Sequence, residues 1–396
     1  MYRDARNGIG TKRRMNRLAD YASRITSHLS HFTGDVSPRL LPTAFALCTA
    51  FLLGGILILF FGERPFEVYG LLWQSVFGSL DDFGYVLFNA TPLIFTGLAV
   101  MLGFKGGLFN IGCEGQLYLA GFATAWVGFH LNWGGGWVII PACLVSAILA
   151  GGLWGAIPGV LKARYGVHEV INTIMLNFIA IALTNYLVTE VYKAPNQMTP
   201  HTPLIHEAAQ LPRLSAFSSV FLPSNPVNIT LFFAFALIGI MQFFLKRTKW
   251  GYEIRFVGNA TEVATYAGIN VRRVTVWTMA LSGAVAGFAG VWEVMGYRYR
   301  FLDNFSPGFG FTGIVVALLG RNHPYGVLFA ALLFGALNKG ALDIEILTNV
   351  PRELFLIIQG VLILLLVCAE GFSDILPNLK DWALRAKAPF GKNRES

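Results

Sequence analysis

Long stretches without any charged residue dominate the pattern of apolar and polar positions along the chain. They are residues 40–62, 83–104, 115–161, 170–189, 214–245, 274–292, 304–320, 322–338 and 354–369. Because about 20 apolar residues in a helix cross the hydrocarbon core of a bilayer, each stretch predicts a spanning helix. The stretch 115–161 is long enough for two, and a Gly-rich turn between Trp133 and Trp137 divides it, since irregular backbone cannot face lipid.

The predicted fold class is therefore all-α, a polytopic membrane protein with about ten transmembrane helices. We expect the spans near 40–61, 84–104, 114–131, 137–161, 169–190, 227–245, 274–295, 308–320, 323–340 and 352–369. A transmembrane domain of residues 39–370 would then contain two long connections, an external loop at 192–226 and a cytoplasmic loop at 246–273. Cytoplasmic tails at 1–38 and 371–396 complete this division, and the first of them is basic.

Composition and charge support the membrane assignment. The chain is 55% hydrophobic and 13% charged, whereas about 25% of the residues in an average soluble domain are charged. A soluble globule and a disordered chain are both excluded. Of the 30 lysines and arginines, 14 lie in residues 1–39 and 246–273, so the net charge of +8 predicts topology rather than binding to nucleic acid. By the positive-inside rule both termini should lie in the cytoplasm.

The densest group of polar residues lies at a glycine-rich break between the second and third predicted spans. Asn110, Glu114 and Gln116 supply donors and acceptors that could replace the hydration of a polar solute, and a broken membrane helix is typical of a transport site. The alternative is a polar turn at the cytoplasmic surface, with Glu114 facing a helix dipole. Asn89 and Thr91, just before Pro92, are similar candidates.

The fifth predicted span carries a polar stripe. At 100° per residue, Glu169, Thr173, Asn177 and Thr184 fall on one helix face. The stripe indicates either the lining of a solute path or hydrogen bonds that hold neighbouring helices together.

The cytoplasmic loop contains a short alanine-rich helix that should end at Gly268, a typical C-terminal cap. Such a helix could fit a groove on another protein, or it could lie on the membrane surface, anchored by Trp250.

Catalytic motifs are missing from the sequence. It has no Gly-x-Ser-x-Gly nucleophile turn, no Gly-x-x-x-x-Gly-Lys-Ser/Thr phosphate loop and no spaced set of metal ligands. We therefore expect no enzyme activity, no catalytic residue, no metal and no cofactor of its own. If transport uses ATP, a partner subunit must bind it.

Five segments, read in order, resemble one family of membrane proteins. They are 91–100, 107–116 (Gly107-Leu-Phe-Asn110-Ile-Gly-Cys-Glu114-Gly-Gln116), 168–177 (His168-Glu-Val-Ile-Asn172-Thr-Ile-Met-Leu-Asn177), 251–273 and 317–326. The family comprises permease subunits of bacterial ABC importers in the nucleoside and simple-sugar branch, related to branched-chain amino-acid permeases. The chain is most similar to the longer permease of a two-permease nucleoside system.

The resemblance implies the partners. They are a cytoplasmic ABC ATPase, a second permease subunit forming a heterodimer rather than a homodimer, an extracytoplasmic solute-binding protein and the lipid bilayer. It also implies that 262–269 is the coupling helix gripped by the ATPase. The residues expected in this contact are Gly258, Glu262, Ala264, Ala267, Gly268 and Ile269. Two departures from the family pattern are Cys113, where alanine is expected, and the Glu262-Val-Ala start of the coupling segment.

The predicted function is thus translocation of a nucleoside or simple sugar across the inner membrane by an ABC permease subunit. The alternative is an ion-coupled secondary transporter of a small polar solute. That alternative requires buried carboxylates for the driving ion, and the acidic residues here are expected near the ends of the spans.

Overall fold

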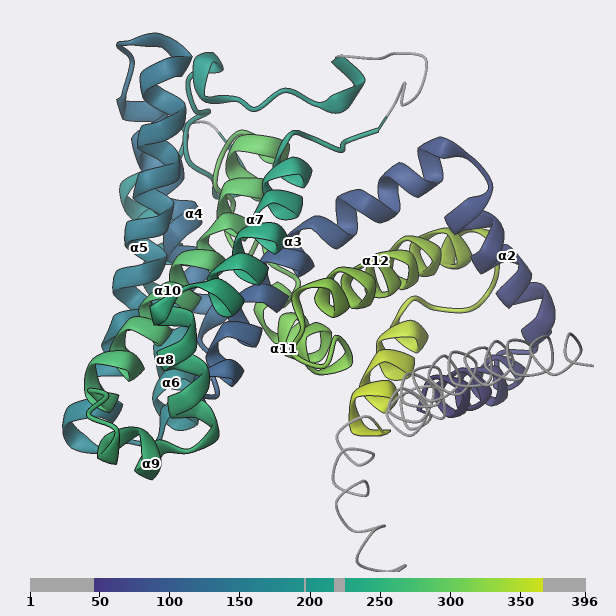
Figure 1. The fold of residues 1–396 in the computed structure, drawn as a ribbon. Helices are drawn as coiled ribbons and strands as arrows, with labels where there is room; N and C mark the ends of the chain where they lie inside the picture. The colour runs from purple at the N-terminus through teal and green to yellow at the C-terminus, as the bar shows by residue number, and fades with distance from the viewer. Residues whose placement is uncertain (1–45, 196, 217–224, 366–396) are drawn as a thin grey trace, which may run out of the picture. The chain divides into compact units, whose positions relative to one another are not determined.

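The computed structural model describes residues 46–195, 197–216 and 225–365 (Figure 1). The described residues fall into two units, one of residues 54–359 and one that includes residues 46–53 and 360–365. Within the second unit, the described residues 46–53 and 360–365 are helical. The predicted tails at 1–38 and 371–396 lie outside the described residues.

Helices account for most of the larger unit and confirm the all-α prediction. They are α2 (Pro65–Phe77), α3 (Leu80–Lys105), α4 (Cys113–His130), α5 (Gly135–Tyr165), α6 (Glu169–Tyr186), α7 (Thr230–Arg247), α8 (Lys249–Asn259), α9 (Thr261–Tyr266), α10 (Val271–Val291), α11 (Phe309–Leu319) and α12 (Pro324–Leu347). Two π-helical segments extend α6 and α10, at Leu187–Val191 and Trp292–Arg298. Two further apolar helices, Ala46–Phe60 and Glu353–Leu365, flank this series.

Six described helices are long and apolar enough to cross a membrane: α3, α5, α7, α12, and α6 and α10 with their π-helical extensions. The number rises to seven if Ala46–Phe60 and α2, which are bent by 116° at the break between them, form one span. The protein is thus a polytopic membrane protein, but the predicted ten spans are not confirmed. The helices α11 and Glu353–Leu365 have fewer than 18 residues, and the first turn of α4 is polar.

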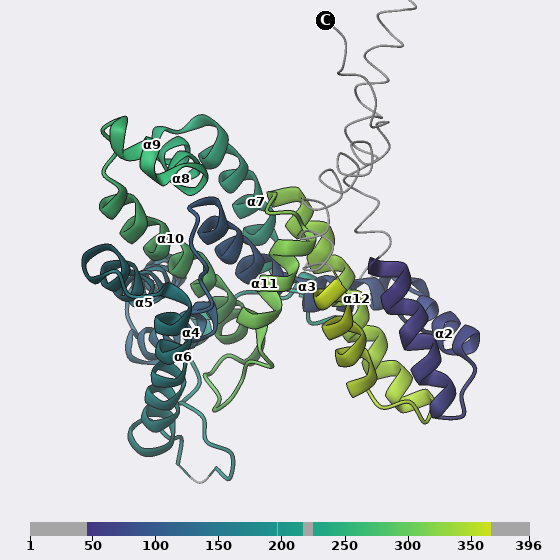
Figure 2. The same ribbon diagram turned by 90° about the horizontal axis from the view of Figure 1, so that it is seen from below.

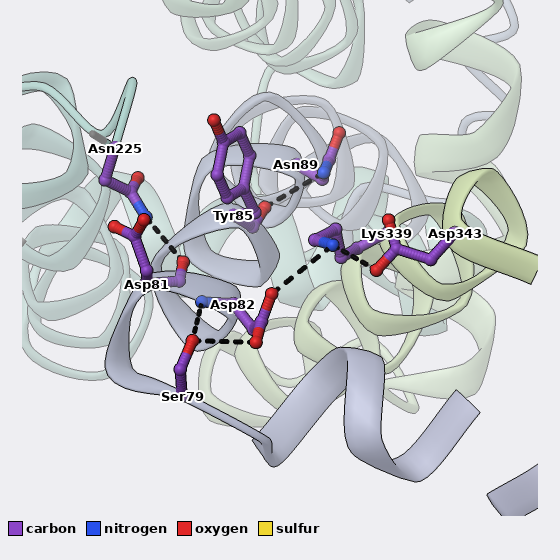
Figure 3. A network of polar contacts seen from close by, with 8 residues as sticks. All are labelled: Ser79, Asp81, Asp82, Tyr85, Asn89, Asn225, Lys339 and Asp343. Atoms are coloured by element: carbon purple, nitrogen blue, oxygen red, sulfur yellow. Dashed lines mark hydrogen bonds and ion pairs between the residues drawn. The ribbon is translucent and has the colours of Figure 1, made fainter. Parts of the chain in front are cut away.

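Two features of the structure near α12 differ from the sequence prediction. The helix α2 was not predicted, and α12 continues to Leu347 rather than ending at 340. Lys339, the second-to-last residue of the predicted span 323–340, therefore lies well inside α12, with its side chain 12% exposed. Its ammonium group pairs with Asp343 one turn later, and it lies 3.5 Å from Asp82 Oδ1 at the start of α3 (Figure 3). These carboxylates compensate a charge that a membrane helix would otherwise exclude.

The central helix of this unit is α3. In its most apolar 18-residue window, 89% of the residues are buried, against 22% for α5. It contacts α10, α11 and α12 along its length (Figures 1 and 2). A side chain on α3 therefore meets protein, whereas most of α5 presents apolar side chains outward, as expected of a helix that faces lipid or a partner subunit.

The closest helix pair is α5 with α10. A Cβ atom added to Gly151 of α5 would collide with the carbonyl oxygen of Gly283 on α10, and the reverse substitution would collide with the oxygen of Gly151. Small residues at such crossings let two membrane helices approach until their backbones touch. This contact fixes α10 against α5 and so places Ser282, which belongs to the site described below.

The segment between α6 and α7 packs on the π-helical end of α10. Leu211 N–H donates to Met295 O at 2.8 Å, and Asn228 Nδ2 donates to Gly296 O at 2.9 Å. A further bond runs from Thr202 N–H to Phe301 O at 3.0 Å. The predicted external loop is therefore tied to the backbone of the bundle by hydrogen bonds.

Candidate functional site

The polypeptide between α3 and α4 breaks the helix and buries a side-chain amide. Asn110 is fully buried, and its Nδ2 donates to Gln116 Oε1 at 3.0 Å and to Ser282 Oγ at 2.8 Å. Its Oδ1 accepts from Gly112 N–H at 2.9 Å, and Ser282 in turn donates to Ala99 O at 2.6 Å. One amide thus connects α3, α4 and α10, and its hydrogen-bonding capacity is used within the protein.

A second amide holds the same break from the side of α6. Asn177 is 2% exposed; its Oδ1 accepts from Gly115 N–H at 2.8 Å and its Nδ2 donates to Ile111 O at 2.9 Å. Both backbone groups lie where α4 begins, at positions that the helix itself leaves without partners. Asn177 therefore replaces the hydrogen bonds that the broken helix cannot make.

Glu114 caps a different helix from its own. Its carboxyl is 2% exposed, and Oε2 accepts from the N–H of Gly310, the second residue of α11, at 2.6 Å. The N-terminal N–H groups of a helix carry partial positive charge and attract an anion. Glu114 therefore faces the N-terminus of α11 rather than the dipole of its own helix, and it does so inside the protein rather than in a surface turn.

Asn110, Glu114, Gln116 and Asn177 form what we call the polar cluster. Thr173 lies beside it, because a Cβ on Gly112 would be 3.2 Å from Thr173 Cβ. The other predicted pathway residues lie elsewhere and bond to their own helices: Asn89 to Tyr85 O, Thr91 to Leu87 O and Thr184 to Ala180 O. Glu169 pairs with Lys162. That these residues line a solute path stays a prediction.

The predicted coupling segment forms α9, which is shorter than expected. Ala267 caps α9, and Gly268 adopts the left-handed conformation with φ of +78°. Gly268 N–H donates to Thr265 O at 3.1 Å and Ile269 N–H to Ala264 O at 3.0 Å. This pair of bonds is the Schellman motif, which ends a helix by turning the chain away. The expectation that 262–269 is one helix is therefore corrected, while the stop at Gly268 is confirmed.

The surface of α9 is open and partly apolar. Tyr266 is 92% exposed and Val263 is 54% exposed, and Glu262, Ala267 and Gly268 are exposed as well. Ala264 is instead fully buried beneath the helix. Large exposed side chains on a short, well-terminated helix are typical of a contact with another protein.

The end of α8 connects the α9 region to the polar cluster. The Cα of Gly258 lies 3.1 Å from the position of a Cβ on Gly107, and a Cβ on Gly258 would collide with Lys105 O and lie 2.7 Å from Gly107 N. The turn at 105–107 is the start of the break that continues to Asn110. The end of α8 and the start of the break are therefore in direct backbone contact.

An aromatic group at the opposite end of α10 was missed by the sequence analysis. The ring of Trp292 is 4.8 Å from that of Phe88, 5.9 Å from that of Tyr297 and 5.6 Å from that of Phe309, measured between centroids. Beside it Glu293, 3% exposed, lies 3.4 Å from Arg298 Nε. Phe88 belongs to α3, Phe309 belongs to α11, and the other two rings belong to the π-helical segment that follows α10, so no local pattern connects all four. The only local signal is the charged pair in the apolar run 291–298.

Comparison with known proteins extends these observations to a family. The family described as the branched-chain amino acid transport system permease component matches residues 83–367. The guanosine ABC transporter permease protein NupP of Bacillus subtilis is 38% identical over 346 residues, which cover 86% of this chain and 97% of that protein. No solved structure matches the chain.

Other relatives are named for different solutes. A nucleoside ABC transporter permease protein of Lactococcus lactis is 34% identical, covering 90% of this chain and 98% of that protein. A glucose ABC transporter permease protein of Haloferax volcanii is 35% identical, covering 82% and 86%. Both matches extend over the polar cluster and the α8–α9 loop. With its bundle of apolar helices and these matches across most of its length, the chain belongs to the family of ABC transporter permease components of the branched-chain amino acid type.

Proposed function

We propose that this permease moves a nucleoside across the cell inner membrane, using ATP that separate cytoplasmic subunits bind and hydrolyse. The observation that carries the proposal is the 38% identity with a guanosine permease over 97% of that protein's length. A sugar is the competing solute, because the glucose permease is 35% identical. A binding protein outside the membrane would deliver the solute, as the family resemblance implies.

The route for coupling runs from α9 to the polar cluster. An ATPase that grips the exposed Tyr266 and Val263 would move α8, whose Gly258 touches the turn at 105–107. That turn leads directly into Asn110, whose bonds reach α4 and α10. Because a packed interface moves as a unit rather than deforming continuously, a shift at α8 would reorient several helices together.

A second permease would complete the pathway. Bacillus subtilis has a second guanosine ABC transporter permease protein, NupQ, which is 28% identical to this chain over 254 residues. Two similar but unequal permeases in one organism favour a heterodimer. The low burial of α6 and α7 leaves apolar surface for such a partner.

The experiment is to express the chain with its partner permease, ATPase and binding protein and to measure uptake of radiolabelled guanosine and of glucose. We expect ATP-dependent uptake of guanosine that unlabelled glucose does not compete away. Uptake of glucose but not of guanosine would show that the solute is a sugar rather than a nucleoside. Uptake by the purified chain alone, driven by an ion gradient, would contradict the ABC mechanism and support the secondary-transporter alternative.

The coupling step has its own test in Tyr266→Ala. Because an exposed aromatic side chain is a frequent energetic centre of a protein contact, we expect uptake and co-purification of the ATPase to fall about tenfold or more. The matched control is Tyr325→Ala, which removes a 49% exposed tyrosine at the start of α12. Equal effects of the two variants would contradict the assignment of α9 as the coupling helix.

A further inference from the structure

A cavity opens where α5 ends and α10 begins. Its volume is about 380 Å³, and three of the side chains lining it are arginines: Arg164 at the end of α5, and Arg272 and Arg273 at the start of α10. Its remaining lining is Val160, Ala163, Asn270, Val276 and Trp277. The lining therefore combines three positive charges with an apolar floor and contains no acidic residue.

The three arginines have no ion-pair partner in the part of the chain that the structure describes. Among the described residues, none of them lies within ion-pair distance of a carboxylate, whereas Lys162, two residues before Arg164, is paired with Glu169. Arg273 instead lies over the ring of Trp250, with its guanidinium carbon 5.0 Å from the ring centroid. The positive end of the α10 dipole adds to their field, because Arg272 and Arg273 occupy its first turn.

An apolar track leads along α5 to this cavity. Leu149, Leu153 and Ile157 are 55%, 68% and 38% exposed, and their spacing of four residues places them on one face of the helix. The same face continues through Val160 and Arg164 into the cavity. Trp277, 46% exposed, lies in the lining, and tryptophan is enriched at the level of lipid headgroups.

We propose that this cavity binds the phosphate headgroup of an anionic phospholipid, whose acyl chain lies along the exposed track of α5. Arginine presents paired N–H donors that match phosphate oxygens, and basic pockets between membrane helices are suited to such headgroups. Asn270, which lines the cavity, directly follows Gly268 and Ile269 in the chain. A bound lipid would therefore hold the start of α10 beside the coupling helix α9.

The test titrates the purified full chain, delipidated in a neutral detergent, with phosphatidylglycerol and counts bound lipid by native mass spectrometry. We expect one site with high affinity, which phosphatidylcholine does not fill. Each arginine near an anionic headgroup contributes about a fivefold change in affinity. The variant with Arg164→Gln, Arg272→Gln and Arg273→Gln should therefore bind phosphatidylglycerol at least tenfold more weakly.

The control removes the same charge from basic residues outside the cavity lining, with Arg247→Gln, Lys249→Gln and Arg321→Gln. It should retain the site, and the melting temperatures of both triple variants should show that they are folded. Equal loss in the two variants, or equal binding of phosphatidylcholine, would overturn the proposal.

Inorganic phosphate is the second probe: if it competes for the site at the concentration of the lipid, the site takes free phosphate and the lipid assignment fails. Loss of ATPase co-purification in the cavity variant without loss of lipid would also overturn it, because the arginines would then face a protein.

Discussion

The polar cluster and the α8–α9 loop use similar residues in opposite ways. Both combine glycines, small residues and a glutamate at a break between helices. In the cluster, Asn110, Glu114 and Asn177 are nearly or fully buried, and each has protein hydrogen-bond partners. In the loop, Glu262 and Tyr266 are exposed. The comparison indicates that the cluster holds the bundle together in this conformation, whereas the loop presents a surface to a partner.

The two regions are also in mechanical contact, through Gly258 and the turn at 105–107. A buried network in which each group has a partner resists small displacements, because breaking it leaves unpaired polar groups in a medium of low dielectric constant. A push on α8 would therefore be resisted up to a limit and then move the whole network. Four substitutions test this contrast.

The largest expected effect is that of Asn110→Leu. It leaves the Gln116 amide and Gly112 N–H without their partner and removes one of the hydrogen bonds of Ser282, which keeps its bond to Ala99 O; each buried unpaired group costs about 1–3 kcal/mol. We expect the free energy of unfolding to fall by about 3 kcal/mol or more, measured by thermal denaturation of the full chain in detergent. The control Asn259→Leu, at the exposed end of α8, should change it by no more than about 0.5 kcal/mol. Similar effects of the two variants would remove the contrast between the regions.

Asn177→Leu should have the next largest effect. It removes the acceptor for Gly115 N–H and the donor for Ile111 O, so we expect a loss of about 2 kcal/mol in the same denaturation assay. Thr184→Val is the control from the same stripe, because its hydroxyl bonds only within α6. If Asn177→Leu is neutral for stability but abolishes uptake, the residue lines the solute path rather than clamping the break.

Gly258→Ala tests the contact between the regions. The added Cβ would lie under 3.0 Å from backbone atoms of Lys105 and Gly107, and overpacking of this kind costs about 1–3 kcal/mol. We expect a loss of about 1.5 kcal/mol in stability and a fall in ATP-dependent uptake. Gly239→Ala, in α7 with nothing within 4 Å of the added atom, should be tolerated in both assays. Uptake at the normal rate in Gly258→Ala would show that coupling bypasses the turn at 105–107.

The smallest effect is expected for Gly268→Ala. The space around Gly268 is open, so the cost comes from the left-handed backbone conformation alone, about 1 kcal/mol. Because this strain falls on the exposed stop of α9, hydrogen exchange should quicken in α9 while exchange in α3 and α4 is unchanged. Faster exchange throughout the bundle would mean that α9 is part of the folded core and not a separate docking element.

Much of the architecture could be predicted from local pattern. The charge-free stretches located α3, α5, α6, α7 and α10, because a membrane helix needs a continuous apolar run regardless of its neighbours. The stop at Gly268 was also predictable, since it depends on a single backbone conformation. The predicted end of α12 at 340 was wrong because the charge-free stretch stops just before Lys339, whereas Asp82, 257 positions earlier in the chain, helps to compensate this charge inside the helix.

Sequence alone therefore determined the fold class, the family resemblance, the helix break at 105–116 and the terminator of α9, all of which depend on residues close together in the chain. Only the tertiary structure decided what the polar residues do. The partner of Asn110 lies 172 residues away, that of Gly115 lies 62 away and that of Glu114 lies 196 away. A polar side chain in an apolar run must find a partner, but which helix supplies it is a property of packing, and no local pattern encodes it.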